Sequence, residues 1–169
     1  MERHAQVSAA PRLRDVAPAD LAALAALRRR AVIAVEAPYT ADELAAWADV
    51  DLGGLRTAVA TGSGAVAIAE ADGAPQGFAW VEAGARPHLR SLYVDPRASR
   101  RGVGTLLLRR SEQWVRTQGG RWLFVAASLN AVGFYAACGY ASDQPFAVRL
   151  DGPSGPLQLA MRKMVHRLD

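Results

Sequence analysis

The sequence predicts a mixed α/β domain in which one sheet is flanked by helices. The first observation is the order of the expected elements: strand, two helices, three strands, helix, strand, helix and two strands. The second is a hydrophobic share of 51% in 169 residues, which is enough for a substantial core. The third is that no internal repeat or low-complexity linker divides the chain. We therefore expect a flexible leader over residues 1–11 and a single domain over residues 12–169.

The N-terminal part is expected to hold one short strand and two helices. Residues 12–16 alternate between polar and apolar side chains, as in a strand. Apolar residues then recur at helical spacing from Asp20 until Pro38, which ends that segment. The stretch from Thr40 to Glu43 is a capping-box pattern, so Thr40 is expected to cap a second helix that runs through Trp47.

The middle of the chain is expected to contain three strands. The pair Gly53-Gly54 is expected to open a loop, after which strand-like segments cover residues 65–71 and 76–82. A turn sequence at residues 72–75 separates these two segments, which predicts a hairpin. A third strand is expected over residues 88–95 and ends at the proline that follows.

The C-terminal part is expected to hold two helices and three strands. In chain order these are a helix over residues 105–118, a strand over 122–126, a short helix over 131–138, and strands over 146–150 and 157–164. The continuous apolar run at 122–126 is typical of a strand that is buried on both faces. A glycine follows the short helix at Gly139, where a helix commonly ends.

The charged residues permit an anionic partner without identifying it. The chain has 20 basic and 16 acidic residues, for a net charge of +4, and Lys163 is its one lysine. Arginine binds phosphate and carboxylate groups through a planar fork. Because the arginines scatter along the chain without a recognition motif, no nucleic acid is expected as a partner. The run Arg28-Arg29-Arg30 is expected to lie at a solvated helix surface.

Several kinds of site and location are not expected. The single cysteine, Cys138, rules out an intramolecular disulfide and a multi-cysteine zinc site. The three histidines lie far apart in the sequence, so no metal is expected. Since the chain has neither an apolar stretch of 18 residues nor a signal-peptide core, no membrane is expected and a cytoplasmic location is the default.

Residues 88–140 carry the chemical information, beginning with a strand, a glycine-containing loop and a helix. The free N–H groups and the positive dipole end at a helix start attract anions. Gly102 and Gly104 lack the Cβ atoms that would hold a phosphate away from the backbone, and Arg100 and Arg101 add positive charge. The segment therefore predicts a diphosphate site, although it fits neither the dinucleotide fingerprint nor the Walker loop.

Five short patterns follow one another in this region. They are Leu92-Tyr93-Val94-Asp95-Pro96, Arg100-Arg101-Gly102-Val103-Gly104-Thr105-Leu106-Leu107, Asn130, Phe134-Tyr135 and Gly139-Tyr140. With their spacing and the flanking element order, they resemble the GNAT superfamily of acyl-CoA N-acyltransferases over about a third of the chain. The sequence departs from the family at Ser99, where Gln or Arg is usual, and Arg100 or Arg101 is expected to supply that side chain.

The resemblance implies both a fold and a site for coenzyme A. The fold is a mixed, mostly antiparallel sheet of six or seven strands with about four helices, in which a bulge splays a parallel strand pair that holds the cofactor. An amide near Val94 is expected to face the thioester oxygen. The residues implied to contact the cofactor are Leu92, Tyr93 and Val94 along the pantetheine arm, Arg100, Arg101, Gly102, Val103, Gly104 and Thr105 at the pyrophosphate, Asn130 beside the pantetheine, and Tyr135 at the sulfur.

Catalysis of acyl transfer to an amine requires an acid and a base. Tyr135 is the expected acid, because the leaving thiolate needs a proton and a phenol of pKa ~10 keeps one at neutral pH. The base is left open. His88 is the first candidate, Glu82 the second and Glu70 the third, with a water chain as the alternative.

The expected function is transfer of acetyl from acetyl-CoA to a primary amine by direct attack in a ternary complex within one N-acetyltransferase domain. The acceptor, a small molecule or a protein amine, is not identified by the sequence, although Tyr39 and Trp47 could line its pocket. A catalytically silent CoA-binding sensor or interaction module is the alternative. Dimers are common in the family, so a homodimer is a candidate assembly.

Overall fold

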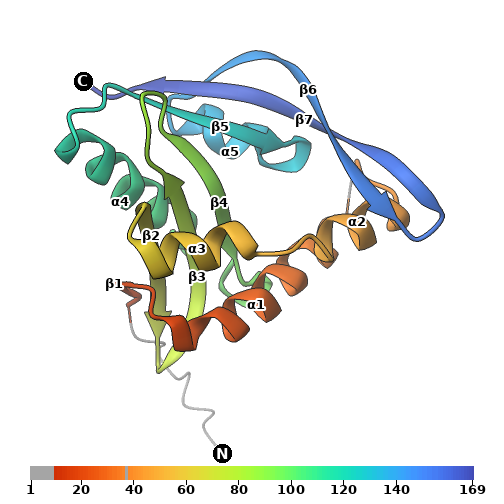
Figure 1. Cartoon of the computed structure of the whole chain (residues 1–169), viewed down its shortest axis with the longest axis horizontal. Helices are drawn as coiled ribbons and strands as arrows, with labels where there is room; N and C mark the ends of the chain where they lie inside the picture. The colour runs from red at the N-terminus through yellow and green to blue at the C-terminus, as the bar shows by residue number, and fades with distance from the viewer. Residues whose placement is uncertain (1–9, 37) are drawn as a thin grey trace, which may run out of the picture.

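The computed structural model describes residues 10–36 and 38–169, so most of the expected leader lies outside the described residues. Seven strands form one sheet in the order β1-β2-β3-β4-β5-β7-β6, and all neighbours are antiparallel except β4 and β5 (Figure 1). The strands are β1 (Arg12–Asp15), β2 (Gly64–Ala71), β3 (Ala74–Glu82), β4 (His88–Val94), β5 (Trp122–Ser128), β6 (Ala141–Gly152) and β7 (Gly155–Arg167). This mixed, mostly antiparallel sheet with one parallel pair confirms the expected fold class.

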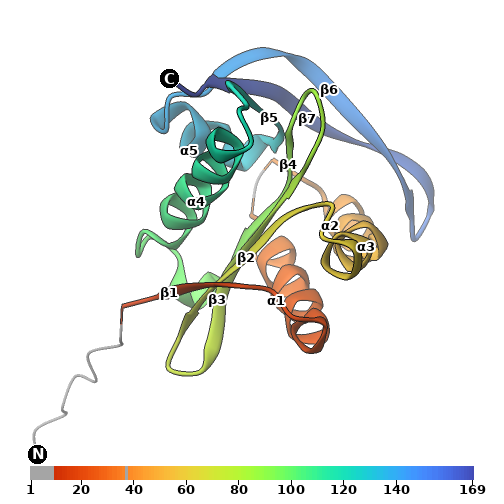
Figure 2. The ribbon, with the colours of Figure 1, turned by 60° about the vertical axis from the view of Figure 1, so that its left-hand side comes forward.

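Helices cover both faces of the half-sheet formed by β1 to β4 (Figure 2). The α-helices of the described residues are α1 (Leu21–Ile33), α2 (Ala41–Ala48), α3 (Gly53–Thr61), α4 (Val103–Thr117) and α5 (Val132–Ala137). On one face, α1 and α3 enclose a small core with Leu24, Leu27 and Phe78. On the other face, α4 contributes Leu107 and Leu108 to the larger core. The sheet is therefore held between two apolar layers.

The second helix begins as its capping box predicts. The Glu43 amide donates to the Thr40 hydroxyl oxygen at 3.3 Å, and the Thr40 amide donates to the Glu43 carboxylate at 2.7 Å. These two bonds satisfy backbone donors that a helix start leaves open. They fix the direction in which α2 leaves the connection from α1, and α2 carries Trp47 toward the pocket described below.

The expectation of a loop at Gly53-Gly54 is wrong, because α3 begins there. The helix buries Leu55 and Ala58, three residues apart on one face, against the sheet. Packing of this face outweighs the low helix propensity of two glycines. A glycine at position 54 also fits for a steric reason, because a Cβ atom there would lie only 2.6 Å from the Trp80 ring.

The expectation of a solvated surface for the arginine run is also wrong for one of its three members. Arg28 is buried at 4% exposure and donates to two main-chain carbonyl oxygens at 2.6 Å. Arg29 and Arg30 are exposed as expected, and Arg29 pairs with Asp49 at the surface. Arg30 also donates to the buried carboxylate of Asp95 at 2.7 Å. The run therefore ties α1 to the segments that follow it.

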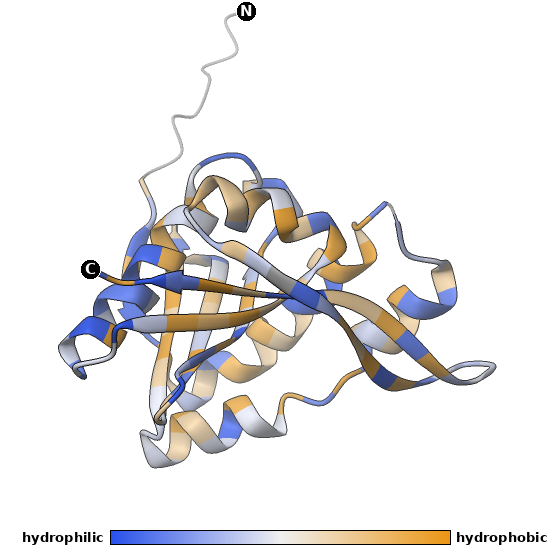
Figure 3. Ribbon diagram, turned by 90° about the horizontal axis from the view of Figure 1, so that it is seen from above, coloured by the Kyte–Doolittle hydropathy of each residue, from blue (hydrophilic) through white to orange (hydrophobic). Residues whose placement is uncertain are grey.

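The β6–β7 hairpin is longer than the expected strands and extends past the rest of the sheet (Figure 1). Hydrophobic and hydrophilic residues alternate along it (Figure 3), as in Leu157, Leu159 and Met161 of β7. Near its turn, the Ser154 hydroxyl donates to Asp42 of α2 at 3.2 Å. Across residues 10–36 and 38–169, none of the helices is both long and apolar enough to cross a membrane.

Candidate active site

The site is built where β4 and β5 stop pairing. The two parallel strands are in register only at His88–Phe124 and Leu89–Val125, near the start of β4. On the other edge of β4, Leu89 lies opposite Val81 and Ser91 lies opposite Trp80, which leaves Arg90 as an extra residue. A bulge of this kind bends its strand and increases the local twist. The bulge at Arg90 therefore precedes the part of β4 that leaves β5.

Beyond the bulge, backbone groups of β4 face the opening. The Asp95 amide donates to the Gln76 carbonyl at 2.8 Å, on the β3 side of the strand. Gly77 and Val94 are consequently a non-hydrogen-bonded pair of the antiparallel ladder. Because successive amides of a strand point in opposite directions, the N–H groups of Val94 and Leu92 point away from β3. They lie on the edge that β5 has left.

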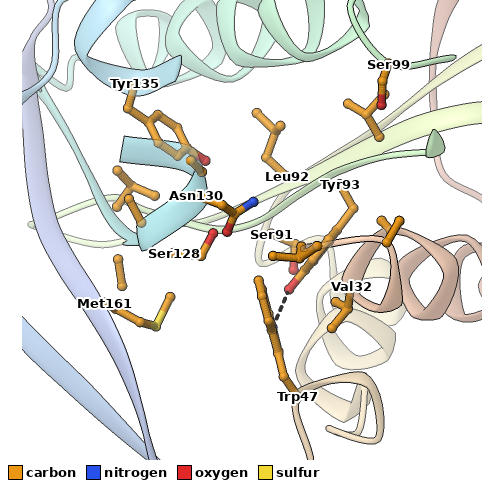
Figure 4. A pocket seen from close by; sticks show the side chains of 18 of the residues that line it. Val32, Trp47, Ser91, Leu92, Tyr93, Ser99, Ser128, Asn130, Tyr135 and Met161 are labelled. Atoms are coloured by element: carbon orange, nitrogen blue, oxygen red, sulfur yellow. Dashed lines mark hydrogen bonds between the residues drawn. The ribbon is translucent and has the colours of Figure 1, made fainter. Parts of the chain in front are cut away.

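A pocket of about 790 Å³ occupies the space between the separated strands and is here called the splay pocket. Its walls come from β4, from the end of β5, from α1 and α2, and from β7 (Figure 4). The lining residues that carry the argument below are Glu36, Trp47, Leu92, Tyr93, Val94, Ser99, Arg100, Asn130, Tyr135 and Met161. Residues from several distant parts of the chain therefore meet in one cavity.

Tyr135 and Asn130 point into the same part of the splay pocket (Figure 4). The Tyr135 ring packs edge-on against Phe134 and Tyr140, at centroid distances of 5.1 and 5.5 Å. Tyr135 is 5% exposed, and its burial, with a smaller effect of Tyr93, raises the pKa of its hydroxyl. No hydrogen bond from a described residue contributes to this shift, so a protonated donor is available to a ligand.

The start of α4 presents unsatisfied backbone donors. In the described part of the chain, no acceptor bonds the six amides from Arg100 to Thr105, and the first helical bond runs from the Leu106 amide to the Gly102 carbonyl at 2.9 Å. Gly102 has a φ of 81°, a left-handed conformation that favours glycine. Arg100 lines the splay pocket, whereas Arg101 lines a separate hollow beside Val103. Free amides at a helix start, with Arg100 close by in the sequence, are groups of the kind that bind anions.

None of the three side chains predicted as candidate bases lines the splay pocket. His88 lies at the paired end of β4, about 20 Å along an extended strand from Val94, and one of its ring nitrogens lies 2.8 Å from the Arg86 carbonyl. Glu82 accepts a hydrogen bond from Arg90 at 2.6 Å. Glu70 accepts one from Arg14 at 2.9 Å, on the far side of β2. Each of these three side chains makes its polar contact outside the splay pocket.

The contacts that Tyr39 and Asp95 make near the splay pocket were not predicted from the sequence. The Tyr39 hydroxyl donates to the Ala160 carbonyl at 2.6 Å and accepts from the Leu129 amide at 2.8 Å. It thereby joins β7 to the turn that carries Asn130, so it shapes the wall that the sequence expected it to line. Asp95, which follows β4, accepts hydrogen bonds from both Arg30 and Arg97. The contacts of Tyr39, and the contact between Arg30 and Asp95, join distant parts of the chain, so the local sequence carries no signal for them.

The acidic lining residue Glu36 was also missed. The helical spacing in the sequence continues until Pro38, but α1 ends at Ile33, and this earlier helix end leaves Glu36 in the connection that lines the pocket. As for metals, the residues that the structure describes contain no group of three or more His, Cys, Asp or Glu side chains placed to hold an ion.

The mixed sheet, the separated parallel strands and the splay pocket are the features expected of the GNAT type of fold. Residues 35–149 match the family model described as an acetyltransferase (GNAT) domain. The chain is also 33% identical, over 150 residues, to the aminoglycoside N(6')-acetyltransferase type 1 of Stenotrophomonas maltophilia, with 79% of this chain and 88% of that protein covered. The chain belongs to the GNAT acetyltransferase family.

Solved structures agree with this assignment. A GCN5-related N-acetyltransferase from Rhodopseudomonas palustris superposes with a TM-score of 0.83 at 32% identity, covering 96% of this chain and 99% of that one. The PaiA N-acetyltransferase from Thermoplasma acidophilum, solved in complex with coenzyme A, has a TM-score of 0.76 at 19% identity, with 94% and 99% covered. The second similarity shows a shared fold.

Proposed function

We propose that this chain is an N-acetyltransferase that transfers acetyl from acetyl-CoA to a primary amine by direct attack in a ternary complex. The observation that carries the proposal is the unpaired edge of β4, which opens on a pocket lined by Leu92, Val94, Asn130 and Tyr135. Its backbone groups offer a strand-like partner to an extended amide chain such as pantetheine. The coenzyme A complex of the PaiA N-acetyltransferase, which has the same fold, supports the choice of ligand.

The residues at both ends of the splay pocket fit coenzyme A. A pyrophosphate needs several N–H donors and positive charge, and the six free amides from Arg100 to Thr105 supply the first. Arg100 supplies the second, because it lines the same pocket. Along the free edge of β4, an amide near Val94 that points into the opening is the proposed donor to the thioester oxygen as charge develops on it.

Tyr135 is the proposed general acid. The neutral amine attacks the thioester carbon, the carbon–sulfur bond breaks, and the sulfur leaves with the bonding electron pair as a thiolate. The Tyr135 hydroxyl donates its proton to that sulfur, and the amide nitrogen loses its extra proton to solvent. Since burial raises the pKa of Tyr135, the hydroxyl stays protonated across the neutral range.

Replacing Tyr135 by Phe tests the acid role. The Y135F variant should release thiol from acetyl-CoA about a hundredfold more slowly than the wild type, the lower end of what a positioned acid contributes. Its acetyl-CoA affinity should stay within about twofold, because no hydrogen bond from a described residue acts on the hydroxyl. An unchanged rate would remove Tyr135 from the mechanism.

The same assay separates an enzyme from a silent binding module. The enzyme releases thiol in the presence of at least one member of a broad amine panel, whereas a CoA-binding sensor binds acetyl-CoA and releases none. A cytoplasmic location and a homodimer stay predictions, as does the absence of metal and nucleic-acid partners. With His88, Glu82 and Glu70 outside the splay pocket, the route of the amine's first proton is proposed to run through water.

A further inference from the structure

Among the described residues that line the splay pocket, Glu36 is the single carboxylate. It lies beyond the last turn of α1 and is exposed to solvent. No described residue forms an ion pair or a hydrogen bond with it, in contrast to Glu82 and Glu70, which each pair with an arginine. The Glu36 charge is therefore available to a ligand that enters the pocket from this side.

An aromatic wall belongs to the same side of the splay pocket. The Trp47 indole N–H donates to the Tyr93 hydroxyl at 3.2 Å (Figure 4), and the Tyr39 ring packs edge-on against Trp47 at a centroid distance of 5.7 Å. These two contacts hold the indole in one orientation. Met161 of β7 also lines this region. A fixed indole and a thioether form a surface suited to an apolar or aromatic body.

The charged groups of the splay pocket include one carboxylate and two guanidiniums. Buried Arg28 lies 5.5 Å from the centre of the Tyr93 ring, and its hydrogen bonds go to carbonyl oxygens of Trp47 and Val50 instead of a carboxylate. Arg100 lines the splay pocket, as does Arg90, which pairs with Glu82. A ligand with one ammonium group can pair it with Glu36. Each further ammonium would enter without a carboxylate partner among the described lining residues, which is unfavourable.

We propose that Glu36 binds the positive charge of the acceptor, and that the acceptor is a primary amine with a single charge and an apolar or aromatic body. This inference rests on the proposed N-acetyltransferase function and names the substrate class of the same site. It separates this chain from the relative named for an aminoglycoside, since aminoglycosides carry several ammonium groups. Glu36 is the specificity-determining residue and Trp47 is the apolar contact.

The test measures amine binding and amine turnover separately. 2-Phenylethylamine is titrated calorimetrically into the full chain saturated with coenzyme A, and its KM is measured by thiol release from acetyl-CoA. Glu36→Gln should weaken binding and raise KM about fivefold, as expected for the loss of one partly exposed ion pair. The effect should shrink at high salt, and Glu36→Asp should restore part of it. Asp51→Asn is the matched control, because it removes an equal charge outside the splay pocket.

A second comparison uses wild-type protein and two polycations, kanamycin and spermidine. The value of kcat/KM for 2-phenylethylamine should exceed that for either polycation at least about tenfold. Equal or greater turnover of a polycation, or an unchanged amine affinity in Glu36→Gln, would overturn the inference while leaving the N-acetyltransferase function intact. Failure of that function has a different signature, since acetyl-CoA itself would then not bind.

Discussion

Asp95→Asn tests whether the junction between β4 and α4 is held by charge. The Asp95 carboxylate is 3% exposed and accepts from Arg30 at 2.7 Å and from Arg97 at 2.9 Å. A hydrogen bond to a charged group contributes about 1.5–3 kcal/mol, but Arg97 is 79% exposed, so solvent screens its contribution. With Arg30 half exposed, the expected loss in the free energy of unfolding is about 2 kcal/mol.

The assay is urea denaturation at pH 7 and at decreasing pH, with Asp15→Asn as control. Asp15 is 88% exposed and lies 3.7 Å from Arg110, so its replacement should change stability by less than about 0.5 kcal/mol. Hydrogen bonds from Arg97 and then Arg30 hold the pKa of Asp95 well below its usual range. Its contribution is therefore present above an unfolded pKa of about 3.9 and is lost as the pH falls through the folded value. Equal stability of the two variants at pH 7 would refute this reasoning.

Two further substitutions test local features. Gly102→Ala places a Cβ in open space but at a φ of 81°, so it should cost about 1 kcal/mol in urea denaturation and weaken acetyl-CoA binding; unchanged values of both would contradict the assigned role. Tyr140→Phe removes the donor to the buried Glu112 carboxylate at 3.1 Å, so thermal denaturation should show a loss of about 1–3 kcal/mol. A Tyr140→Phe protein as stable as the wild type would show that water replaces the phenol.

The fold class was predictable because hydrophobic periodicity and turn residues are local signals. Strands such as residues 65–71, and the helix cap at Thr40, can be recognised from a few neighbouring residues. The helix α3 did not, because its two initial glycines resemble a loop and only burial of Leu55 against the sheet stabilises it. The burial of Arg28 was missed for a related reason: its hydrogen-bond partners lie 19 and 22 positions away.

The candidate site was predictable in part. Leu92, Val94, Asn130 and Tyr135 meet in the splay pocket because parallel strands and the helices after them converge at the same end of the sheet. His88 was chosen for its titration range, yet it begins β4, at the end where β4 and β5 are still paired. The titration range of a side chain does not indicate at which end of β4 the two parallel strands separate. The position of the glycine loop does, because this loop follows the end of β4 that lies away from β5.

The most direct test of the account is a calorimetric titration of acetyl-CoA into the full chain at physiological salt. The unpaired edge of β4 and the free amides at the start of α4 predict one molecule bound per chain, with a dissociation constant in the micromolar range or below. Absence of binding in the micromolar range would contradict the assignment of the splay pocket to coenzyme A, and with it the proposed acetyl transfer.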